Sequence, residues 1–404
     1  MFIKEAIPSI IKDSRNKKTI QIELYTFEGK FKSSAPSGKS RGKSEVDPYN
    51  SKGIEKSLSL LKLFCKKIQD TNFKIKKIDD LKSLVEKVKR FESKYGRLGG
   101  NCTYALESVF LKAAAADNNC EVWELIHKDM YPGKKPKMPM PVGNCIGGGL
   151  HSEFVRGKRP DFQEFLLIPK EKSFCHAVTI NLKAYYKAKS ILKSRRINDE
   201  NAVETFKTNE EVLEVLSKIA KQYKLRIGLD IAASSFFEKG YYKYKNKELI
   251  RDKVDQTDYI KNLIKKFNIF YVEDPMQEED FSGFKEILNY TKDNNLKTLV
   301  VGDDLVTTNM RLTMRAVGSD SINAMIIKPN QIGSLIEVKK VVEFCNKHNI
   351  AKIFSHRDGE TSDNILADYC IGFEGDFIKT GIYGRERLIK LKRIIDIEKT
   401  LNRF

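Results

Sequence analysis

Residues 268–275 read NIFYVEDP, a stretch that begins as a buried strand and ends in two adjacent carboxylates. The four residues from Ile269 form a short run of strand-forming apolar side chains, and a proline closes the stretch, which is typical of a fully buried strand. On this stretch alone a structural explanation is sufficient: Asp274 caps the next element and Glu273 faces solvent. The question is whether other strands of the chain end in the same way.

Six successive apolar runs in the second half of the chain each end in an ionisable side chain. Helical patterns separate the runs, and successive ends lie 23 to 43 residues apart, about one βα unit. The six residues are Asp230, Glu273, Asp303, Lys328, His356 and Lys379. In a parallel (β/α) barrel the C-terminal strand ends open on one face, so these side chains are predicted to converge on one cavity. Capping explains one such residue but poorly explains six, and a functional site is favoured.

Three of the six are carboxylates on adjacent strands. A set of oxygen ligands suits a hard, octahedral cation, most naturally Mg²⁺. The two lysines would be a base and its electrostatic partner, because a lysine is a poor base unless a second cation or a metal lowers its pKa. The predicted reaction is proton abstraction next to a metal-bound carboxylate, with the metal stabilising the enediolate.

A proline-rich segment at residues 130–144 divides the chain into two compositions. Before it, residues 19–36 have the pattern of a hairpin and three helical patterns follow, which predicts an α+β domain over residues 1–130. After it, seven apolar runs and a plausible eighth at residues 140–146 alternate with helical patterns, which predicts a parallel (β/α) barrel over residues 131–404. An open doubly wound sheet is the alternative, but its G-x-G-x-x-G turn is missing.

Composition limits the classes of function. The 404 residues are 41% hydrophobic and 31% charged, and no apolar run approaches the roughly 18 to 20 residues of a membrane helix. Residues 1–18 lack an apolar core of signal-peptide length, which predicts no export signal. Seven scattered cysteines without a C-x-x-C pair predict reduced thiols in a cytoplasmic protein.

The net charge is strongly positive, with 73 basic against 54 acidic residues and a formal charge of +19. Such a charge can mark a nucleic-acid partner. The lysines are spread along the chain without interleaved aromatic residues, so a solvated lysine-rich surface is favoured, and an incidental affinity for polyanions stays open.

Five motifs in the second half resemble the successive barrel motifs of the enolase family: VEDP, VGDDL, IIKPNQIGSL, SHRDGETSD and FIKTG. DSRNKKTIQIEL, SAPSGKSRG, GGGLHSEF, PDFQEFLLIP and GLDIAASSFF extend the resemblance over nearly the whole chain, and the flap and PDFQEF are most similar to archaeal enolases. The resemblance implies an N-terminal α+β capping domain, an enolase-type (β/α)8 TIM-like barrel, and Mg²⁺-dependent dehydration of 2-phospho-D-glycerate to phosphoenolpyruvate, a step of glycolysis. It also implies a homodimer or a higher homo-oligomer.

The resemblance assigns roles to individual residues of this chain. Asp230, Glu273 and Asp303 resemble the ligands of a first Mg²⁺, and Ser40 resembles the residue that ligates a second one. Lys328 resembles the base that removes the C2 proton, and Lys379 its partner at the substrate carboxylate. The remaining matches are His356 and Arg357 for substrate binding, with Arg357 on the phosphate, His151 on the flap, Gln163 and Glu164 near the departing hydroxyl, and Glu200 as the acid that protonates it.

The chain departs from the family pattern at the loop end of the site. Asn201 and Ala202 replace glycines beside Glu200, which puts the placement of that acid in question. Asp358 stands where the family has a phosphate-binding serine, and an unpaired acid 4 Å from a phosphate charge costs on the order of 4 kcal/mol. Lys39 and Arg41 replace small residues of the first loop; Arg41 neutralises Asp358, binds an anion or is merely exposed.

Three functions remain open at this stage. The first is an enolase, and the second is a related enzyme that dehydrates another 3-hydroxy acid. The third is a catalytically lapsed scaffold that binds RNA or protein, against which the retention of all six strand-end groups argues.

Overall fold

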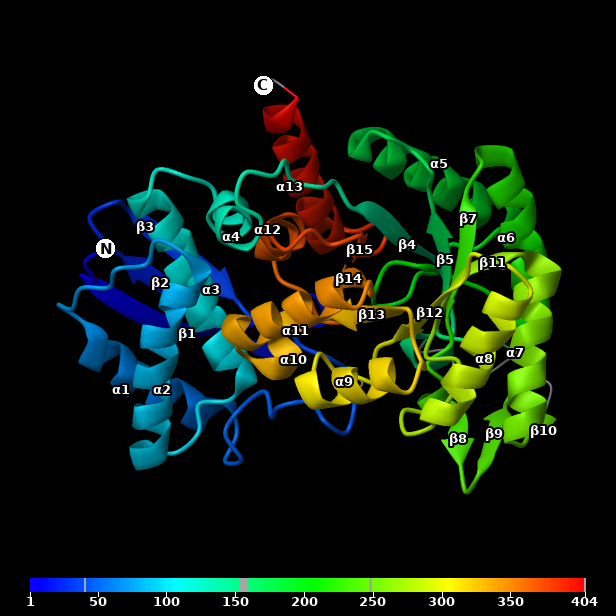
Figure 1. Ribbon diagram of the computed structural model, residues 1–404, viewed down its shortest axis with the longest axis horizontal. Coiled ribbons are helices and arrows are strands. Elements are labelled where there is room, and N and C mark those ends of the chain that lie inside the picture. The colour runs from blue at the N-terminus through cyan, green and yellow to red at the C-terminus, as the bar shows by residue number, and fades with distance from the viewer. Residues whose placement is uncertain (40, 153–158, 247–248, 403–404) are drawn as a thin grey trace.

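The computed structural model describes residues 1–39, 41–152, 159–246 and 249–402 (Figure 1). It opens with a three-stranded antiparallel sheet of order β1-β2-β3. The strands are β1 (Glu5–Lys12), β2 (Lys18–Tyr25) and β3 (Lys30–Ser34). Ile20, Ile22 and Leu24 of β2 alternate with outward side chains and are fully buried. The predicted hairpin is therefore confirmed as β2 and β3, whereas β1 was not predicted.

Helices cover the inner face of this sheet. The N-terminal helices are α1 (Ile54–Ile68), the 3₁₀ helix η1 (Ile78–Leu81), α2 (Lys82–Tyr95), α3 (Gly100–Asp117) and α4 (Val122–Met130). The three helical patterns of the sequence correspond to α1, α2 and α3. Helix α3 is buried on nearly all sides, because it lies between the small sheet and the second half of the molecule.

Eight strands form a closed barrel, since the last strand pairs with the first. They are β4 (Met140–Gly147), β5 (Glu164–Ile168), β7 (Arg226–Asp230), β11 (Ile269–Glu273), β12 (Leu299–Gly302), β13 (Ala324–Ile327), β14 (Ala351–Ser355) and β15 (Phe377–Lys379). The short β6 (Val203–Glu204) extends the sheet beside β4.

The prediction of a wholly parallel barrel is wrong at one strand. Strand β5 runs antiparallel to both β4 and β7, while the other barrel strands run parallel to their neighbours. The connection from β4 to β5 has 16 residues, and the only helix in its described part is the three-residue 3₁₀ helix Gly149–His151, which is too short for a crossover to a parallel strand. As a result the start of β5 lies beside the end of β7, and Glu164 pairs in register with Asp230.

Helices surround the barrel. They are α5 (Phe174–Leu192), α6 (Asn209–Tyr223), α7 (Lys253–Phe267), α8 (Phe281–Asp293), α9 (Met310–Gly318), α10 (Pro329–Ile332), α11 (Leu335–Lys347), α12 (Ile365–Gly372) and α13 (Arg385–Leu401). They follow the predicted alternation from β7 onward, whereas α5 and α6 both lie between β5 and β7. Short elements fill two connections: the 3₁₀ helices η2 (Gly149–His151) and η3 (Ala233–Phe236), and the strands β8 (Phe237–Glu238), β9 (Tyr241–Tyr244) and β10 (Leu249–Arg251). Side-chain caps such as Thr208 on α6 and Asp252 on α7 fix where helices begin.

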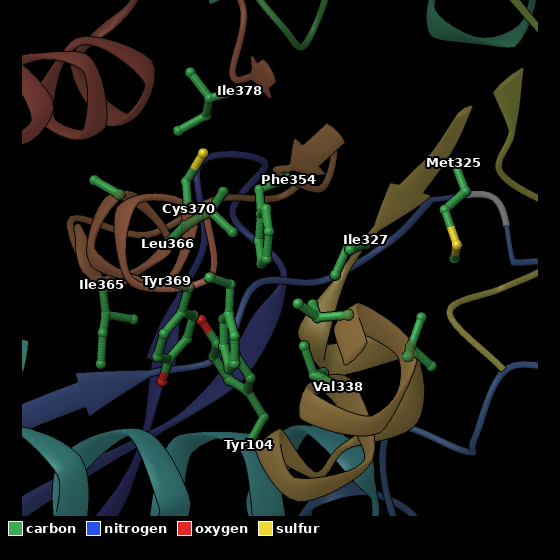
Figure 2. Packing of buried hydrophobic residues seen from close by; sticks show 14 of the residues in the cluster. Tyr104, Met325, Ile327, Val338, Phe354, Ile365, Leu366, Tyr369, Cys370 and Ile378 are labelled. Atoms are coloured by element: carbon green, nitrogen blue, oxygen red, sulfur yellow. The ribbon is translucent and has the colours of Figure 1, made fainter. Parts of the chain in front are cut away.

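The barrel and the N-terminal half share packed side chains. Figure 2 shows strand residues such as Phe354 and Ile327 beside α11 and α12, with Tyr369 of α12 facing Tyr104 of α3. The two tyrosine rings meet edge to face at 6.3 Å, and the Tyr369 hydroxyl donates to Ser108 at 2.7 Å. A smaller apolar cluster that includes Tyr271, Val301 and Ile353 fills the inside of the barrel, so the barrel is a packed scaffold beneath its loops.

All seven cysteines are free, as the scattered spacing predicted. Among the described residues, none of the helices combines the length and apolar character needed to cross a membrane.

Candidate active site

Ten of the predicted site residues line one cavity at the open end of the barrel. They are His151, Gln163, Glu164, Glu200, Asp230, Asp303, Lys328, His356, Arg357 and Lys379. Gln163 and Glu164 belong to this set because β5 runs antiparallel to its neighbours, which places the start of that strand among the ends of the others. The free volume is only about 30 Å³, since the charged side chains pair with one another across the space.

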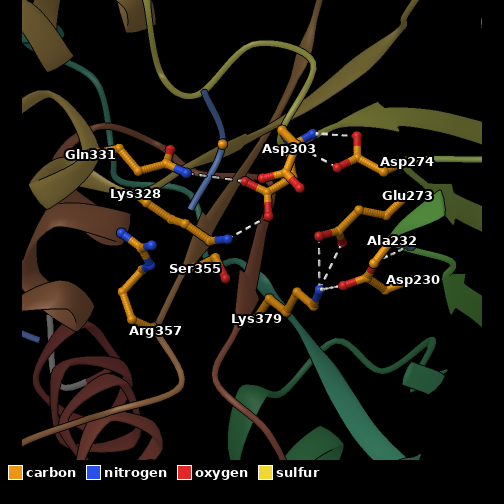
Figure 3. Close-up of polar contacts among 12 residues, drawn as sticks. Asp230, Ala232, Glu273, Asp274, Asp303, Lys328, Gln331, Ser355, Arg357 and Lys379 are labelled. Atoms are coloured by element: carbon orange, nitrogen blue, oxygen red, sulfur yellow. Dashed lines mark hydrogen bonds and ion pairs between the residues drawn. The ribbon is translucent and has the colours of Figure 1, made fainter. Parts of the chain in front are cut away.

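Lys379 is the centre of the carboxylate end of the cavity (Figure 3). Its Nζ lies 2.8 Å from Asp230 Oδ2 and 2.9 Å from both oxygens of Glu273. Glu164 Oε2 is 3.4 Å away, and all four side chains are at least 95% buried. Burial disfavours the ammonium, but the three carboxylates outweigh it and raise the pKa of Lys379 well above its ordinary value.

Glu273 sits behind this lysine, and not on the cavity wall itself. Its carboxylate also accepts a hydrogen bond from the Tyr271 hydroxyl at 2.5 Å, two residues earlier on the same face of β11. Burial together with the charge of Asp230 raises the pKa of Glu273 to about 8. Glu273 therefore faces the barrel interior and, contrary to its structural explanation, does not reach solvent.

Lys328 forms the second lysine contact of the cavity. Its Nζ pairs with Asp303 Oδ2, and Gln331 Nε2 lies 3.4 Å from the other oxygen of Asp303. Burial and the charges of Arg357 and Lys379 lower the pKa of Lys328, yet the adjacent Asp303 carboxylate outweighs them and raises it. Asp303 thus determines the protonation state of Lys328 in this arrangement.

Asp274 has a structural role, but it supports the neighbouring strand end and does not cap the next element. Its two oxygens accept the backbone N–H groups of Asp303 and Asp304 at 3.0 and 2.8 Å. The residue has a φ of +40°, which lies in the left-handed region that aspartate tolerates better than most residues. This contact fixes where Asp303 leaves β12 (Figure 3).

The residues at this end fit a divalent cation. Asp230 and Glu273 direct three oxygens at one ammonium nitrogen, which shows that they already surround a cationic point, and all candidate donors are carboxylates. The ligand atoms of the predicted triad do not all lie close together, however, because Asp303 turns toward Lys328. Within the described part of the chain, the groups whose ligand atoms lie within 4.8 Å of one another are His151, Glu164 and Glu200, and Asp274, Asp303 and Asp304.

Glu200 points into the cavity despite the missing glycines. Asn201 adopts the left-handed conformation with φ +65°, which asparagine tolerates, so no glycine is required there. Asn198 Oδ1 accepts the backbone N–H groups of Glu200 and Ala202 at 3.0 and 2.9 Å, which closes the loop. Asn144 Nδ2 donates to Glu200 Oε2 at 2.9 Å. The loop therefore presents its acid to the site.

His151 joins the flap to the loop after β14. Its Nε2 lies 2.5 Å from Asp358 Oδ1, and its Nδ1 lies 3.8 Å from both Glu164 and Glu200. Burial disfavours the imidazolium, but the charges of Asp358, Glu200 and Glu164 raise the pKa of His151 to about 10. Asp358 also accepts the Lys39 backbone N–H at 2.7 Å, so the acid that replaces the family serine is fully paired.

Arg357 binds a carboxylate from the first loop. Its two terminal nitrogens lie 3.0 and 3.1 Å from the two oxygens of Glu45, a bidentate geometry in which both side chains are 4% exposed. Of the alternatives for Arg41, exposure agrees with the structure, because its guanidinium lies at the surface beside Asp47 at 3.3 Å. The predicted ligand Ser40 lies outside the described residues.

Sequence reasoning missed Glu45 and Asp304, which line the cavity, and Asn144, which donates a hydrogen bond to Glu200. Asp304 could have been found, since it follows Asp303 directly in VGDDL. Glu45 and Asn144 carry no local signal, because one lies in an irregular loop and the other within the apolar run of β4.

Comparisons with known proteins agree over the whole chain. The family model described as the N-terminal domain of enolase matches residues 3–126, and the model described as its C-terminal TIM barrel domain matches residues 135–403. The chain is 31% identical to the enolase of Picrophilus torridus, over 99% of both chains. It is 32% identical to that of Archaeoglobus fulgidus, over 100% of this chain and 98% of the relative, and 33% identical to that of Ehrlichia canis, over 99% and 97%.

Proposed function

The chain belongs to the enolase family, and on that premise we propose that its cavity catalyses the reversible dehydration of 2-phospho-D-glycerate to phosphoenolpyruvate. One observation carries the proposal: two buried lysines lie among the carboxylates at the open end of a barrel that both enolase domain models match. The reaction needs a base at C2 of the substrate and an acid at the hydroxyl of C3. The cavity offers Lys328 as a base at one end and Glu200 as an acid at the other.

Lys328 is the proposed base. Its protonation is controlled by Asp303, so any ligand that draws the Asp303 charge away leaves Lys328 beside Arg357 and Lys379, whose charges lower its pKa. Lys379 is the proposed contact of the substrate carboxylate, because it is the only other lysine that lines the cavity in the described part of the chain. Its charge then also favours loss of the C2 proton.

Glu200 is the proposed acid at the departing hydroxyl, assisted by Gln163 and Glu164. It lies within 3.4 Å of His356 and 3.8 Å of His151, so the hydroxyl would meet several donors and acceptors at this point. Arg357 is the proposed phosphate contact, and the bidentate carboxylate of Glu45 stands in for a phosphate there, since both present two oxygens to the guanidinium fork.

Mg²⁺ is the proposed cofactor, held by Asp230, Glu273 and Asp303. When bound, it supplies positive charge to the substrate carboxylate. A second Mg²⁺ with Ser40, a homodimer or higher oligomer, and a cytoplasmic role in glycolysis follow from the family membership and are proposed on that ground alone.

The test is the rise of ultraviolet absorbance as phosphoenolpyruvate forms from 2-phosphoglycerate and Mg²⁺. Turnover that stops when the metal is chelated and returns on adding Mg²⁺ is the expected result. Intact Mg²⁺ binding without turnover would instead indicate an enzyme for another 3-hydroxy acid. Loss of both would indicate a lapsed scaffold.

A further inference from the structure

Arg387, near the start of α13, is a buried cation whose contacts all lie on one side of the cavity. Its side chain is fully enclosed, with 1% exposure. Nη1 lies 2.8 Å from His356 Nδ1 and donates to the Arg357 carbonyl at 2.8 Å, and Nη2 donates to the Asp358 carbonyl at 2.7 Å. Within the described residues no carboxylate forms an ion pair with it. Arg387 thus binds three consecutive residues of the segment that carries the proposed substrate contacts.

The contact with His356 determines where that imidazole holds its proton. A guanidinium has only N–H donors and keeps its proton at any pH a protein tolerates. His356 Nδ1 must therefore accept, so its lone pair is free of a proton. A neutral imidazole with an unprotonated Nδ1 carries its hydrogen on Nε2. The two hydrogens of Nη1 are then both used, one for His356 and one for the Arg357 carbonyl.

The Nε2–H of His356 faces the proposed acid. Nε2 lies 3.4 Å from Glu200 Oε1, while Glu200 Oε2 accepts a hydrogen bond from the side-chain amide of Asn144. The charged groups around His356 are Arg387 from α13, Lys379 from β15, Glu200 from its loop and Asp358 from its own segment. Burial, together with the charges of Arg387 and Lys379, lowers the pKa of His356 well below its ordinary value, although Glu200 and Asp358 act in the opposite direction.

We propose that Arg387 is a positioning residue that fixes His356 as a neutral, Nε2-protonated hydrogen-bond donor, whose one hydrogen points to Glu200 in the free protein and to the departing hydroxyl when substrate binds. In this assignment His356 does not exchange a proton during turnover, and Glu200 alone acts as the acid. The assignment of roles rests on the proposed function, but the proton position of His356 follows from the contacts themselves and is measured separately.

The direct test is nitrogen-15 nuclear magnetic resonance of the histidine rings in the unaltered protein between pH 6 and 9. The expected His356 pattern is an unprotonated Nδ1 and a protonated Nε2 that do not change with pH. The chain has five histidines, and the spectrum of a His356→Gln variant identifies the signal that is lost. His176, 59% exposed, serves as a reference. A proton on Nδ1, or on both nitrogens, in this range would overturn the proposal.

Two substitutions separate positioning from simple support. Arg387→Lys keeps a donor-only cation and is expected to preserve the Nε2–H form. Arg387→Gln brings an amide that also accepts, and a fraction of His356 should then carry its proton on Nδ1. The same variant should slow dehydration roughly 10- to 100-fold and leave exchange of the C2 proton within about twofold. A purely structural role would lower both rates alike.

Arg385→Gln is the matched control, because Arg385 lies two residues away on the exposed side of α13 and should change neither the spectrum nor the rates. If Arg387→Gln does not fold, the spectrum of the unaltered protein still decides. If the protein forms no phosphoenolpyruvate, the proposed function fails, whereas the position of the His356 proton is tested by the spectrum alone.

Discussion

The two ends of the cavity are built in different ways. At the carboxylate end, Lys379, Asp230 and Glu273 all project from barrel strands and contact one another directly. At the loop end, the segment after β14 pairs with loops from elsewhere in the chain: Arg357 with Glu45 and Asp358 with His151. One end is part of the scaffold, and the other is assembled when separate loops meet over it.

This difference indicates where chemistry and specificity reside. Side chains on packed strands hold their geometry because their neighbours in the barrel fix their rotamers, which proton abstraction requires. At the loop end the charges are already compensated by other protein groups, so a substrate must displace them to bind. Changes at the strand end should therefore act on the rate of the chemical step, and changes in the pairs formed by Arg357 and Asp358 on affinity.

The largest effect should come from Lys328→Ala. Removing the proposed base should lower dehydration on the order of 10⁴-fold and abolish exchange of the substrate C2 proton with solvent. Exchange is measured by magnetic resonance of the substrate in deuterated buffer. Lys340→Ala is the control, since that lysine is 53% exposed on α11 and should behave as the unaltered protein. Exchange that persists in Lys328→Ala would show that another residue is the base, and the assignment of proton abstraction to the strand end would be wrong.

Glu200→Gln should separate the two steps. The glutamine retains the hydrogen bond from Asn144 through its carbonyl but cannot donate a carboxylic proton, so C2 exchange should continue while dehydration falls roughly 10²- to 10³-fold. Both rates are followed in the same sample. Asp199→Asn alters the adjacent acid, which pairs with Lys39, and should leave dehydration within a fewfold. Normal dehydration by Glu200→Gln would contradict the assignment of the acid.

The residues at the strand end could be predicted from the sequence because their positions follow from the order of the barrel strands. Regular spacing of the apolar runs implied a barrel, and a barrel brings its strand ends together whatever loops lie between them. The same reasoning assumed parallel strands, and β5 is antiparallel. Gln163 and Glu164 reached the site all the same, because the reversal of β5 brings its first residues, and not its last, to the open end.

The loop end was less predictable because its contacts link residues far apart in sequence. Glu45 and Arg357 form an ion pair although they lie 312 positions apart in the sequence, and no motif around either residue indicates the other. Two substitutions that looked unfavourable in the sequence are compensated in the structure. The charge of Asp358 is paired with His151, and Asn201 adopts the left-handed conformation for which the family uses glycine. Motifs identified the substituted positions but could not show what compensates them.

Glu45→Gln should improve substrate binding. Glu45 occupies the guanidinium fork that the substrate phosphate is proposed to use, so its neutralisation should favour the substrate over the protein partner. The KM for 2-phosphoglycerate should fall about tenfold while kcat stays within about threefold. Steady-state kinetics at fixed Mg²⁺ measures both, with Glu55→Gln, an exposed acid on α1, as the control. A higher KM would show that Glu45 holds Arg357 in place for the phosphate.

Asp358→Ser should have the smallest effect near pH 8.5. The Asp358 charge is already balanced by His151, and burial lowers the pKa of His151 once this carboxylate is gone, so one ion pair becomes two neutral groups. The KM for the phosphorylated substrate should therefore change less than about threefold at this pH, where unpaired repulsion at 4 Å would be worth about 4 kcal/mol. As the pH is lowered, His151 of the variant becomes protonated without the Asp358 carboxylate beside it, and the substrate should bind progressively tighter.

The same substitution tests the ion pair through stability. Because the charges of Asp358, Glu200 and Glu164 overcome burial and raise the pKa of His151 from 6.5 to about 10, its contribution to stability is complete below pH 6.5 and is lost as the pH rises through 10. Thermal unfolding at pH 6.5, 8.5 and 10 should therefore show the unaltered protein losing its advantage over Asp358→Ser across this range. Glu204→Gln, which alters another buried acid beside the flap at Ser152, is the control and should show no such convergence. A stability difference independent of pH, or a tenfold gain in affinity at pH 8.5, would mean that Asp358 acts as an unpaired charge and that the loop end repels its substrate.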